Sequence, residues 1–317
     1  MTQTLRQSGT LLGFATILIF LTIQLPETFL TARNLINISQ QLSMLAVVAA
    51  TMTIVMVMND FDLSVGSMAS LAGIVAAVLF AAGFPVWVGL LAALSVGLLG
   101  GLFNGFLVSI LGILPFVATL GTLTVFSGTA FLMSDGKTIF GRDIPEGFSG
   151  FARAGIEIGD MKIPFLTLTA LAVILVCWFI LEQTNFGRRL YAIGGNREAA
   201  HLAGIRVKRL RLMAFALTGL GAAGAGLMYA ARVASANPTQ GSGLMLDAIA
   251  AVFLGMTMSR QGEPRVLYTL VGVLMLGVLD NGLTQLRVDS YVREILVGLI
   301  VISAVAIAAF SKRNTAC

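Results

Sequence analysis

Ionisable and amide side chains inside long apolar stretches are the residues of this chain that could do chemistry. A charge at the depth of a bilayer is costly, so each one calls for an explanation. The densest group is Asn59-Asp60-Phe61-Asp62-Leu63-Ser64, which leaves almost no room for a loop between two apolar runs. Irregular backbone at membrane depth is tolerated only where it faces protein, water or a cavity. The pattern indicates either a broken helix beside a transport pathway or a tight solvated turn, with Asp62 and Ser64 as capping residues.

Isolated polar residues interrupt other apolar runs. They are Asn104, Asp247, Asp280, Asn281 and Gln285. Amides of this kind bind hydroxyl groups, whereas their commoner role, for each taken singly, is a hydrogen bond between helices.

Nothing in the sequence predicts catalysis, a cofactor or a nucleic-acid partner. The single histidine, His201, excludes a multi-histidine metal site. The stretch Asp135-Gly-Lys-Thr138 is no phosphate loop, because Phe131 stands where that loop needs glycine. The stretch Gly219-Leu-Gly221-Ala-Ala-Gly224 has dinucleotide-site spacing but lies in an apolar run without a preceding strand. We predict that these small residues, like Gly97, Gly101 and Gly105, let helices approach closely.

The elements that position these residues are predicted from composition. The 317 residues are 57% hydrophobic and 11% charged, whereas soluble proteins carry roughly 25% charged residues. We predict an all-α, polytopic integral membrane protein in which residues 1–317 form one membrane domain. About ten spans follow from the ~20 apolar residues that a crossing helix needs. They are residues 10–25, 36–58, 63–83, 86–111, 115–134, 163–182, 210–231, 244–258, 266–285 and 291–310.

One basic segment orients the chain. Residues 184–211 hold seven of the 20 Lys and Arg residues, opposed only by Glu198. Basic loops stay in the cytoplasm, so both termini are predicted there as well. Within the loop, Asn196 can cap a short helix, Glu198 suits its first turn, and Gly204 can end it. Such a helix suits the docking of a soluble partner, although a solvated loop that only sets topology explains the charges too.

A short internal repeat connects two of the spans. Residues 100–105, Gly-Gly-Leu-Phe-Asn-Gly, are similar to residues 277–282, Gly-Val-Leu-Asp-Asn-Gly. The copies lie five spans apart and therefore cross in opposite directions. This is the pattern of an inverted repeat, with spans two to five matching seven to ten.

Five segments resemble the ribose/arabinose-type permeases of bacterial ABC importers, in order and spacing, over about residues 33–306. They are NDFDLSVGSMASLAG (59–73), PFVATLGTLTVFSG (115–128), TNFGRRLYAIGGNREAAHLAGIRV (184–207), LDAIAAVFLG (246–255) and GVLDNGLTQL (277–286). The core Glu198-Ala-Ala200, followed by Gly204, is similar to the ABC-permease loop that docks into the ATPase.

The resemblance implies a permease in the bacterial cytoplasmic membrane that imports a pentose or related sugar or polyol. It implies three partners: an ABC ATP-binding subunit, an external sugar-binding protein and a second permease copy, with a homodimer as the favoured form. The ATPase-coupling residues would lie in the loop 184–209: Gly195, Asn196, Glu198, Ala199, Ala200 and Gly204. The pathway candidates would be Asn59, Asp60, Asp62, Ser64, Asn104, Asp280 and Asn281.

The sequence departs from the family pattern in two places. Residues 256–264 replace a Gly- and Ser-rich turn, and Asn59 and Asp60 stand where glycines are common. The main alternative is an ion-gradient-driven secondary transporter, with Asp62, Asp247 and Asp280 as coupling carboxylates. A membrane enzyme or signalling anchor is disfavoured, because no catalytic set and no sizeable soluble domain is evident.

Overall fold

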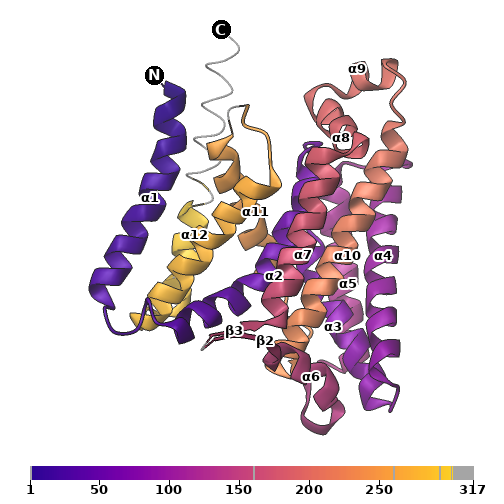
Figure 1. Ribbon diagram of the computed structural model, residues 1–317. Coiled ribbons are helices and arrows are strands. Elements are labelled where there is room, and N and C mark those ends of the chain that lie inside the picture. Colours follow the sequence, from indigo (N-terminus) through magenta and orange to yellow (C-terminus); the bar gives the residue numbers. More distant parts are fainter. Residues whose placement is uncertain (1, 160, 260, 293, 301, 303–317) are drawn as a thin grey trace.

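Long helices run through the height of the molecule, and short strands lie at one end (Figure 1). The computed structural model describes residues 2–159, 161–259, 261–292, 294–300 and 302. The helices are α1 (Thr2–Gln24), α2 (Ala32–Met56), α3 (Val65–Ala81), α4 (Val86–Ser109), α5 (Pro115–Ser134), α6 (Glu146–Arg153), α7 (Phe165–Trp178), α8 (Asn185–Gly195), α9 (Arg197–Leu202), α10 (Val207–Val233), α11 (Leu244–Met258) and α12 (Val266–Gln285). The shorter elements are β1 (Ile139–Phe140), a 3-10 turn (Gly141–Asp143), β2 (Gly155–Ile158), β3 (Met161–Pro164), a π turn (Phe179–Gln183) and β4 (Ser235–Ala236).

The two ends of the bundle differ in what they carry. The short helices α8 and α9 lie at the upper end in Figure 1, and α6, β2 and β3 lie at the lower end. We call these the α9 end and the α6 end. Because α4 rises toward the α9 end and α12 descends from it, the two sequence repeats run in opposite directions.

Each of the first nine predicted spans coincides with a helix in the described part of the chain. Six helical segments are long and apolar enough to cross a membrane: 32–56, 86–109, 115–134, 165–183, 207–233 and 266–285. The apolar helices over residues 11–24, 65–81 and 244–258 are shorter. The tenth predicted span, 291–310, lies largely outside the described residues. The chain is therefore a helical, multi-pass membrane protein.

Helix α10 lies at the centre of the bundle, against α2, α3 and α4. Glycines make its contact with α4 close. A side chain on Gly97 would place its Cβ 2.6 Å from the Gly219 carbonyl oxygen, and one on Gly101 would meet the Phe215 carbonyl. The dinucleotide-like Gly219–Gly224 stretch lies within this helix. The predicted role in helix packing is confirmed for the predicted glycines except Gly224, because an added Cβ at each of the others would collide with a neighbouring helix, whereas one on Gly224 would meet nothing within 4 Å.

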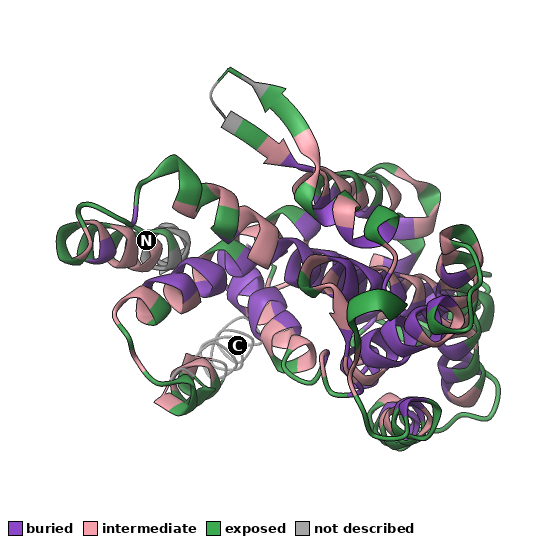
Figure 2. Cartoon of the chain, turned by 90° about the horizontal axis from the view of Figure 1, so that it is seen from below, coloured by how far each residue is buried: buried purple, intermediate pink, exposed green. Residues whose placement is uncertain are grey.

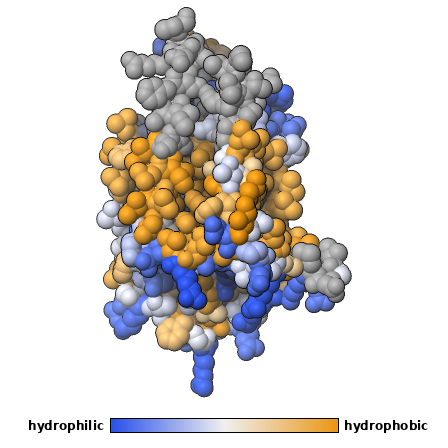
Figure 3. All heavy atoms as spheres, turned by 90° about the vertical axis from the view of Figure 1, so that its left-hand side faces the viewer, coloured by the Kyte–Doolittle hydropathy of each residue, from blue (hydrophilic) through white to orange (hydrophobic). Residues whose placement is uncertain are grey.

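Exposure separates interior helices from peripheral ones (Figure 2). The apolar window of α2 is 83% buried, whereas those of α4 and α5 are 28% and 22% buried. The exposed side chains of α4 and α5 are nevertheless large and apolar, as a lipid-facing surface requires. On the side that carries α1, hydrophobic atoms cover the middle height and hydrophilic atoms gather toward the α6 end (Figure 3).

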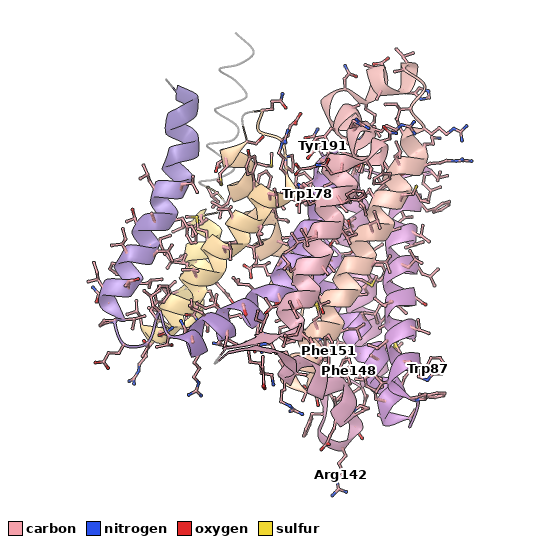
Figure 4. All side chains as sticks on the ribbon, viewed as in Figure 1. Trp87, Arg142, Phe148, Phe151, Trp178 and Tyr191 are labelled. Atoms are coloured by element: carbon pink, nitrogen blue, oxygen red, sulfur yellow. The ribbon has the colours of Figure 1, made fainter. Side chains whose placement is uncertain are left out.

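The α6 end contains short elements of regular structure between the spans. Strand β1 pairs with β4, β2 pairs with β3, and both pairs are antiparallel. Phe148 of α6 is buried, with its ring centroid 5.0 Å from that of Phe80. Trp87, Phe148 and Phe151 lie toward this end, and Trp178 and Tyr191 toward the other (Figure 4). Aromatic residues at two levels are typical of the two membrane interfaces.

An irregular segment, residues 237–243, re-enters the bundle between β4 and α11. Strand β4 is at the α6 end, yet the backbone N–H of Gly241 donates to Ser70 Oγ, 2.9 Å away, near the start of α3. A Cβ on Gly66 would lie 2.5 Å from the Gly241 carbonyl oxygen. This irregular segment therefore packs inside the protein against the first turns of α3, directly after the α2–α3 break.

Candidate functional site

The α2–α3 break is held by a buried ion pair. The Asp60 carboxylate, 1% exposed, accepts hydrogen bonds from Arg211 Nε at 2.7 Å and Nη2 at 2.9 Å. Arg211 belongs to the first turns of α10 and is itself buried. Arg197, the first residue of α9, reaches the same carboxylate with Nη2 at 3.1 Å, although half of its side chain is exposed. One carboxylate therefore ties the break to α10 and to α9.

A second carboxylate in the break has only polar neutral partners. Asp62 Oδ1 accepts hydrogen bonds from the Ser64 backbone N–H at 3.0 Å and from Ser64 Oγ at 2.6 Å. Asn104 of α4 donates to Ser64 Oγ at 2.8 Å and to Asp62 Oδ1 at 3.3 Å. Within the described residues Asp62 forms no ion pair. The predicted capping role is correct in part: Asp62 fixes Ser64 just before α3, whereas Ser64 makes no side-chain cap of that helix.

We call the polar residues in and around the α2–α3 break the break cluster. Its members are Asp60, Asp62, Ser64, Asn104, Arg197 and Arg211. The solvated-turn alternative is wrong for Asp60, Asp62 and Ser64, because each is at most 2% exposed. Asn59 lies at the edge of the cluster, with positive φ, and donates from Nδ2 to the Gly194 carbonyl at 2.7 Å.

Helix α9 has the predicted caps. The side chain of Asn196 accepts the Ala199 N–H at 3.0 Å, and Glu198 lies in the first turn. Gly204, with φ +81°, reverses the chain after the helix. Glu198 and Ala199 are exposed, and Ala200 is buried. Of the six residues of α9 only Ala200 is buried, so the helix is held to the bundle mainly by Ala200 and by the Arg197–Asp60 ion pair.

Sequence analysis missed α8, the helix before α9. The sequence did contain an N-cap signal for α8, because Thr184 caps the helix by accepting the Gly187 N–H at 3.4 Å. Gly195 is its last residue. The Tyr191 hydroxyl donates to the Pro264 carbonyl at 2.9 Å. Burial, with a smaller contribution from Glu182, raises the pKa of the Tyr191 phenol, so that it remains a donor.

Asp280 and Asn281 lie in a separate cluster toward the α6 end of α12. Asn281 and Asn34 exchange two amide hydrogen bonds, at 3.1 and 3.2 Å. Gln41 donates to Asp280 Oδ2 at 2.7 Å, and Gln285 donates to Asn281 Oδ1 at 2.8 Å. We call these five residues the amide cluster. It joins α12 to α2 by hydrogen bonds between helices, so the predicted pathway residues fall into two groups rather than one.

An apolar hollow between the helices differs in character from both clusters. It has a volume of about 640 Å³, between α2, α4, α6, α7 and α10. Its lining is apolar apart from two threonines, Thr51 and Thr169, whose hydroxyls donate to carbonyls of their own helices. It therefore offers no polar group to recognise a sugar.

The arrangement defines a class of protein. A multi-pass helical bundle contains a buried helix break, and the break is linked by Asp60 and Arg197 to an exposed helix at one end. No group of three or more His, Cys, Asp or Glu residues in the described chain could hold a metal ion. These features suit the membrane component of a transport system.

The comparisons identify the family. Residues 34–305 match the family described as branched-chain amino acid transport system, permease component, and the chain belongs to it. It is 37% identical over 301 residues to the ribose import permease protein RbsC of Bacillus subtilis (strain 168), covering 95% of this chain and 92% of that one. The D-allose transport system permease protein AlsC of Escherichia coli (strain K12) is 34% identical, covering 89% of this chain and 85% of that one.

A third relative extends the range of sugars named among these proteins. The galactose/methyl galactoside import permease protein MglC of Escherichia coli (strain K12) is 33% identical, covering 96% of this chain and 94% of that one. No solved structure matches the chain. The predicted resemblance to ribose-type permeases is confirmed by these relatives. The chain is a transport component and not an enzyme.

Proposed function

We propose that this chain is the transmembrane permease subunit of an ABC importer for a monosaccharide, driven by a separate ATPase subunit. The family match carries the permease assignment, and relatives named for ribose, allose and galactose support the sugar class. An external binding protein would deliver the sugar. A pentose or related polyol is the favoured substrate, because the ribose permeases share 37% identity with this chain.

The α9 end is the proposed cytoplasmic side. It carries the basic segment 184–211, and basic loops are retained in the cytoplasm. The membrane is the bacterial cytoplasmic membrane, with ten spans and both termini inside. Residues 1–317 form one membrane domain, and spans two to five and seven to ten form an inverted repeat. The opposite directions of α4 and α12 support that repeat.

Helix α9 is the proposed docking element for the ATPase. Its outward residues Glu198 and Ala199 are exposed, while Asn196 and Gly204 fix its two ends. Gly195 ends α8 directly before the Asn196 cap, and buried Ala200 seats the helix on the bundle. A short helix whose two ends are fixed in this way would move as a unit when a partner displaces it.

The Arg197–Asp60 contact is the proposed route by which movement of α9 reaches the spans. Arg197 moves with α9, while Asp60 belongs to the break and is held by Arg211. A displacement of α9 would therefore pull on the carboxylate that positions the start of α3. Asp62, Ser64 and Asn104, next to it, would line the pathway when the break rearranges. The sugar would cross between two copies of the permease, with Asp280 and Asn281 at the external end.

Glu198→Lys tests the docking assignment. Reversing the charge of this exposed residue should weaken association with the ATPase and abolish sugar uptake, while leaving the protein inserted in the membrane. Arg189→Glu, also a charge reversal at an exposed position but on α8, serves as the control. Normal uptake by the Glu198→Lys variant would overturn the assignment of α9.

Purification in mild detergent separates this proposal from the gradient-driven alternative. A stoichiometric ATPase that co-purifies with the chain supports the ABC importer. Uptake by the chain alone, without ATP, would favour the gradient-driven alternative, with Asp62, Asp247 and Asp280 as its coupling carboxylates.

A further inference from the structure

We propose that a groove beside α9 binds an anionic phospholipid of the cytoplasmic leaflet, with the head group on α10 and part of an acyl chain on the α4–α5 connection. The groove has a volume of about 960 Å³. It lies between the end of α4, the α4–α5 connection, α9 and the first turn of α10. We call it the basic groove. The proposal needs the α9 end to be cytoplasmic but does not need the ATPase.

The net positive charge of the basic groove is complementary to the negative charge of a phosphate group. Five cationic side chains line it, opposed by the single carboxylate Glu198. Arg197 and Arg211 are already paired with Asp60. The remaining three, Arg206, Lys208 and Arg209, are exposed and form no ion pair within the described residues. Basic pockets beside spans on the cytoplasmic side attract anionic lipid head groups.

The opposite wall of the groove is apolar. Residues 110–114, Ile-Leu-Gly-Ile-Leu, connect α4 to α5 without a charged side chain. Ile113 and Leu114 line the groove and are 36% and 69% exposed. Exposed apolar residues continue from them onto α5, at Phe116 and Val117. This continuity with a lipid-facing helix favours a ligand with a hydrocarbon chain over an acidic protein segment or free phosphate.

A buried hydroxyl lies in the same wall. Ser109, the last residue of α4, lines the groove and is 4% exposed, and its Oγ has no hydrogen-bond partner in the described part of the chain. Most other serines and threonines of the spans donate to a carbonyl one turn earlier, as Ser134 does to Ala130 at 2.8 Å. Ser109 is therefore a donor available to a ligand oxygen after a small local movement.

Retention of lipid by the purified full-length chain tests the proposal. Native mass spectrometry would compare phosphatidylglycerol with phosphatidylcholine of the same acyl chains. We expect preferential retention of phosphatidylglycerol by the unmodified protein. Lys208→Gln/Arg209→Gln should reduce it roughly tenfold or more, since each basic residue near the surface contributes on the order of 1 kcal/mol. The control Arg188→Gln/Arg189→Gln removes the same charge from exposed positions on α8 and should leave the preference unchanged.

Further measurements distinguish a bound phospholipid from the other possible ligands of the groove. Leu114→Asn should weaken phosphatidylglycerol retention, and millimolar glycerol phosphate should not compete. Equal retention by the unmodified protein and Lys208→Gln/Arg209→Gln, or equal loss in the control, would overturn the proposal. Effective competition by glycerol phosphate would show a free-phosphate site instead. Release of the lipid on addition of the ATPase would assign the groove to a protein interface. Because lipid retention is measured on the chain alone, failure of the proposed ATPase coupling does not affect it.

Discussion

The break cluster and the amide cluster both place polar side chains between helices, but they stabilise these buried polar groups differently. In the break cluster, Asp60 is 1% exposed and is matched by two arginines from other elements. In the amide cluster, neutral Asn281 exchanges hydrogen bonds with Asn34, and Asp280 is only partly buried. A buried charge without its partner costs several kcal/mol, whereas one lost amide bond costs about 1 kcal/mol. The break cluster should therefore tolerate far less change.

Arg211→Leu should have the largest effect. It leaves the buried Asp60 carboxylate with only the half-exposed Arg197 and should cost about 3–5 kcal/mol of folding free energy. Thermal unfolding of the purified protein, together with its amount in membranes, measures the loss. The double variant Asp60→Leu/Arg211→Leu removes both charges and should recover much of the stability. If the double variant is no more stable than the single one, the ion pair does not explain the site.

Asp62→Leu comes next in the order of expected effects. The leucine leaves the Ser64 N–H and hydroxyl without their acceptor, at a cost of about 1–3 kcal/mol, and should abolish sugar uptake or assembly. Asp62→Asn keeps an oxygen acceptor and should retain most of the fold. Uptake assays and unfolding of both variants make the comparison. Unchanged uptake by the leucine variant would leave the break without a part in transport.

Arg197→Gln should separate stability from coupling. Its guanidinium is half exposed, so the lost ion pair should cost less than about 1 kcal/mol. Uptake should nevertheless fall several-fold while the ATPase still co-purifies, because the contact between α9 and the break is weakened. Arg189→Gln, which removes an exposed charge from α8, is the matched control. Equal uptake by the two variants would mean that Asp60 does not receive motion from α9.

Asn281→Leu should destabilise the protein far less than Arg211→Leu. It removes the exchanged hydrogen bonds with Asn34 and the bond from Gln285, but these partners are only partly buried and can turn to water. We expect about 1–2 kcal/mol of destabilisation in thermal unfolding. A loss as large as that of Arg211→Leu would contradict the distinction between the two clusters.

The helices were predictable because bilayer length and apolarity dominate this sequence. Residues 184–211 also showed the caps of α9, since Asn196 and Gly204 act through local backbone geometry. The Arg211–Asp60 pair was not predictable. Arg211 belongs to a basic stretch whose charges are already accounted for by membrane orientation, so nothing in the sequence indicates a buried partner. The re-entrant segment 237–243 was missed as well. Its Asn-Pro and Gly-Ser-Gly signals mark irregular backbone, but no local signal says that this backbone turns inward to meet Gly66.

The sequence separation within the Asp60–Arg211 pair has a consequence for how the protein is made. The two residues are 151 positions apart, with Asp60 nearer the N-terminus. During synthesis the α2–α3 break therefore emerges with its carboxylate well before the counter-charge is translated. Arg197, the other partner, also emerges late, 137 positions after Asp60. Asp60 can gain these two charged partners only when α9 and α10 arrive, so a chain stopped before residue 197 should be a preferred substrate for membrane quality-control proteases.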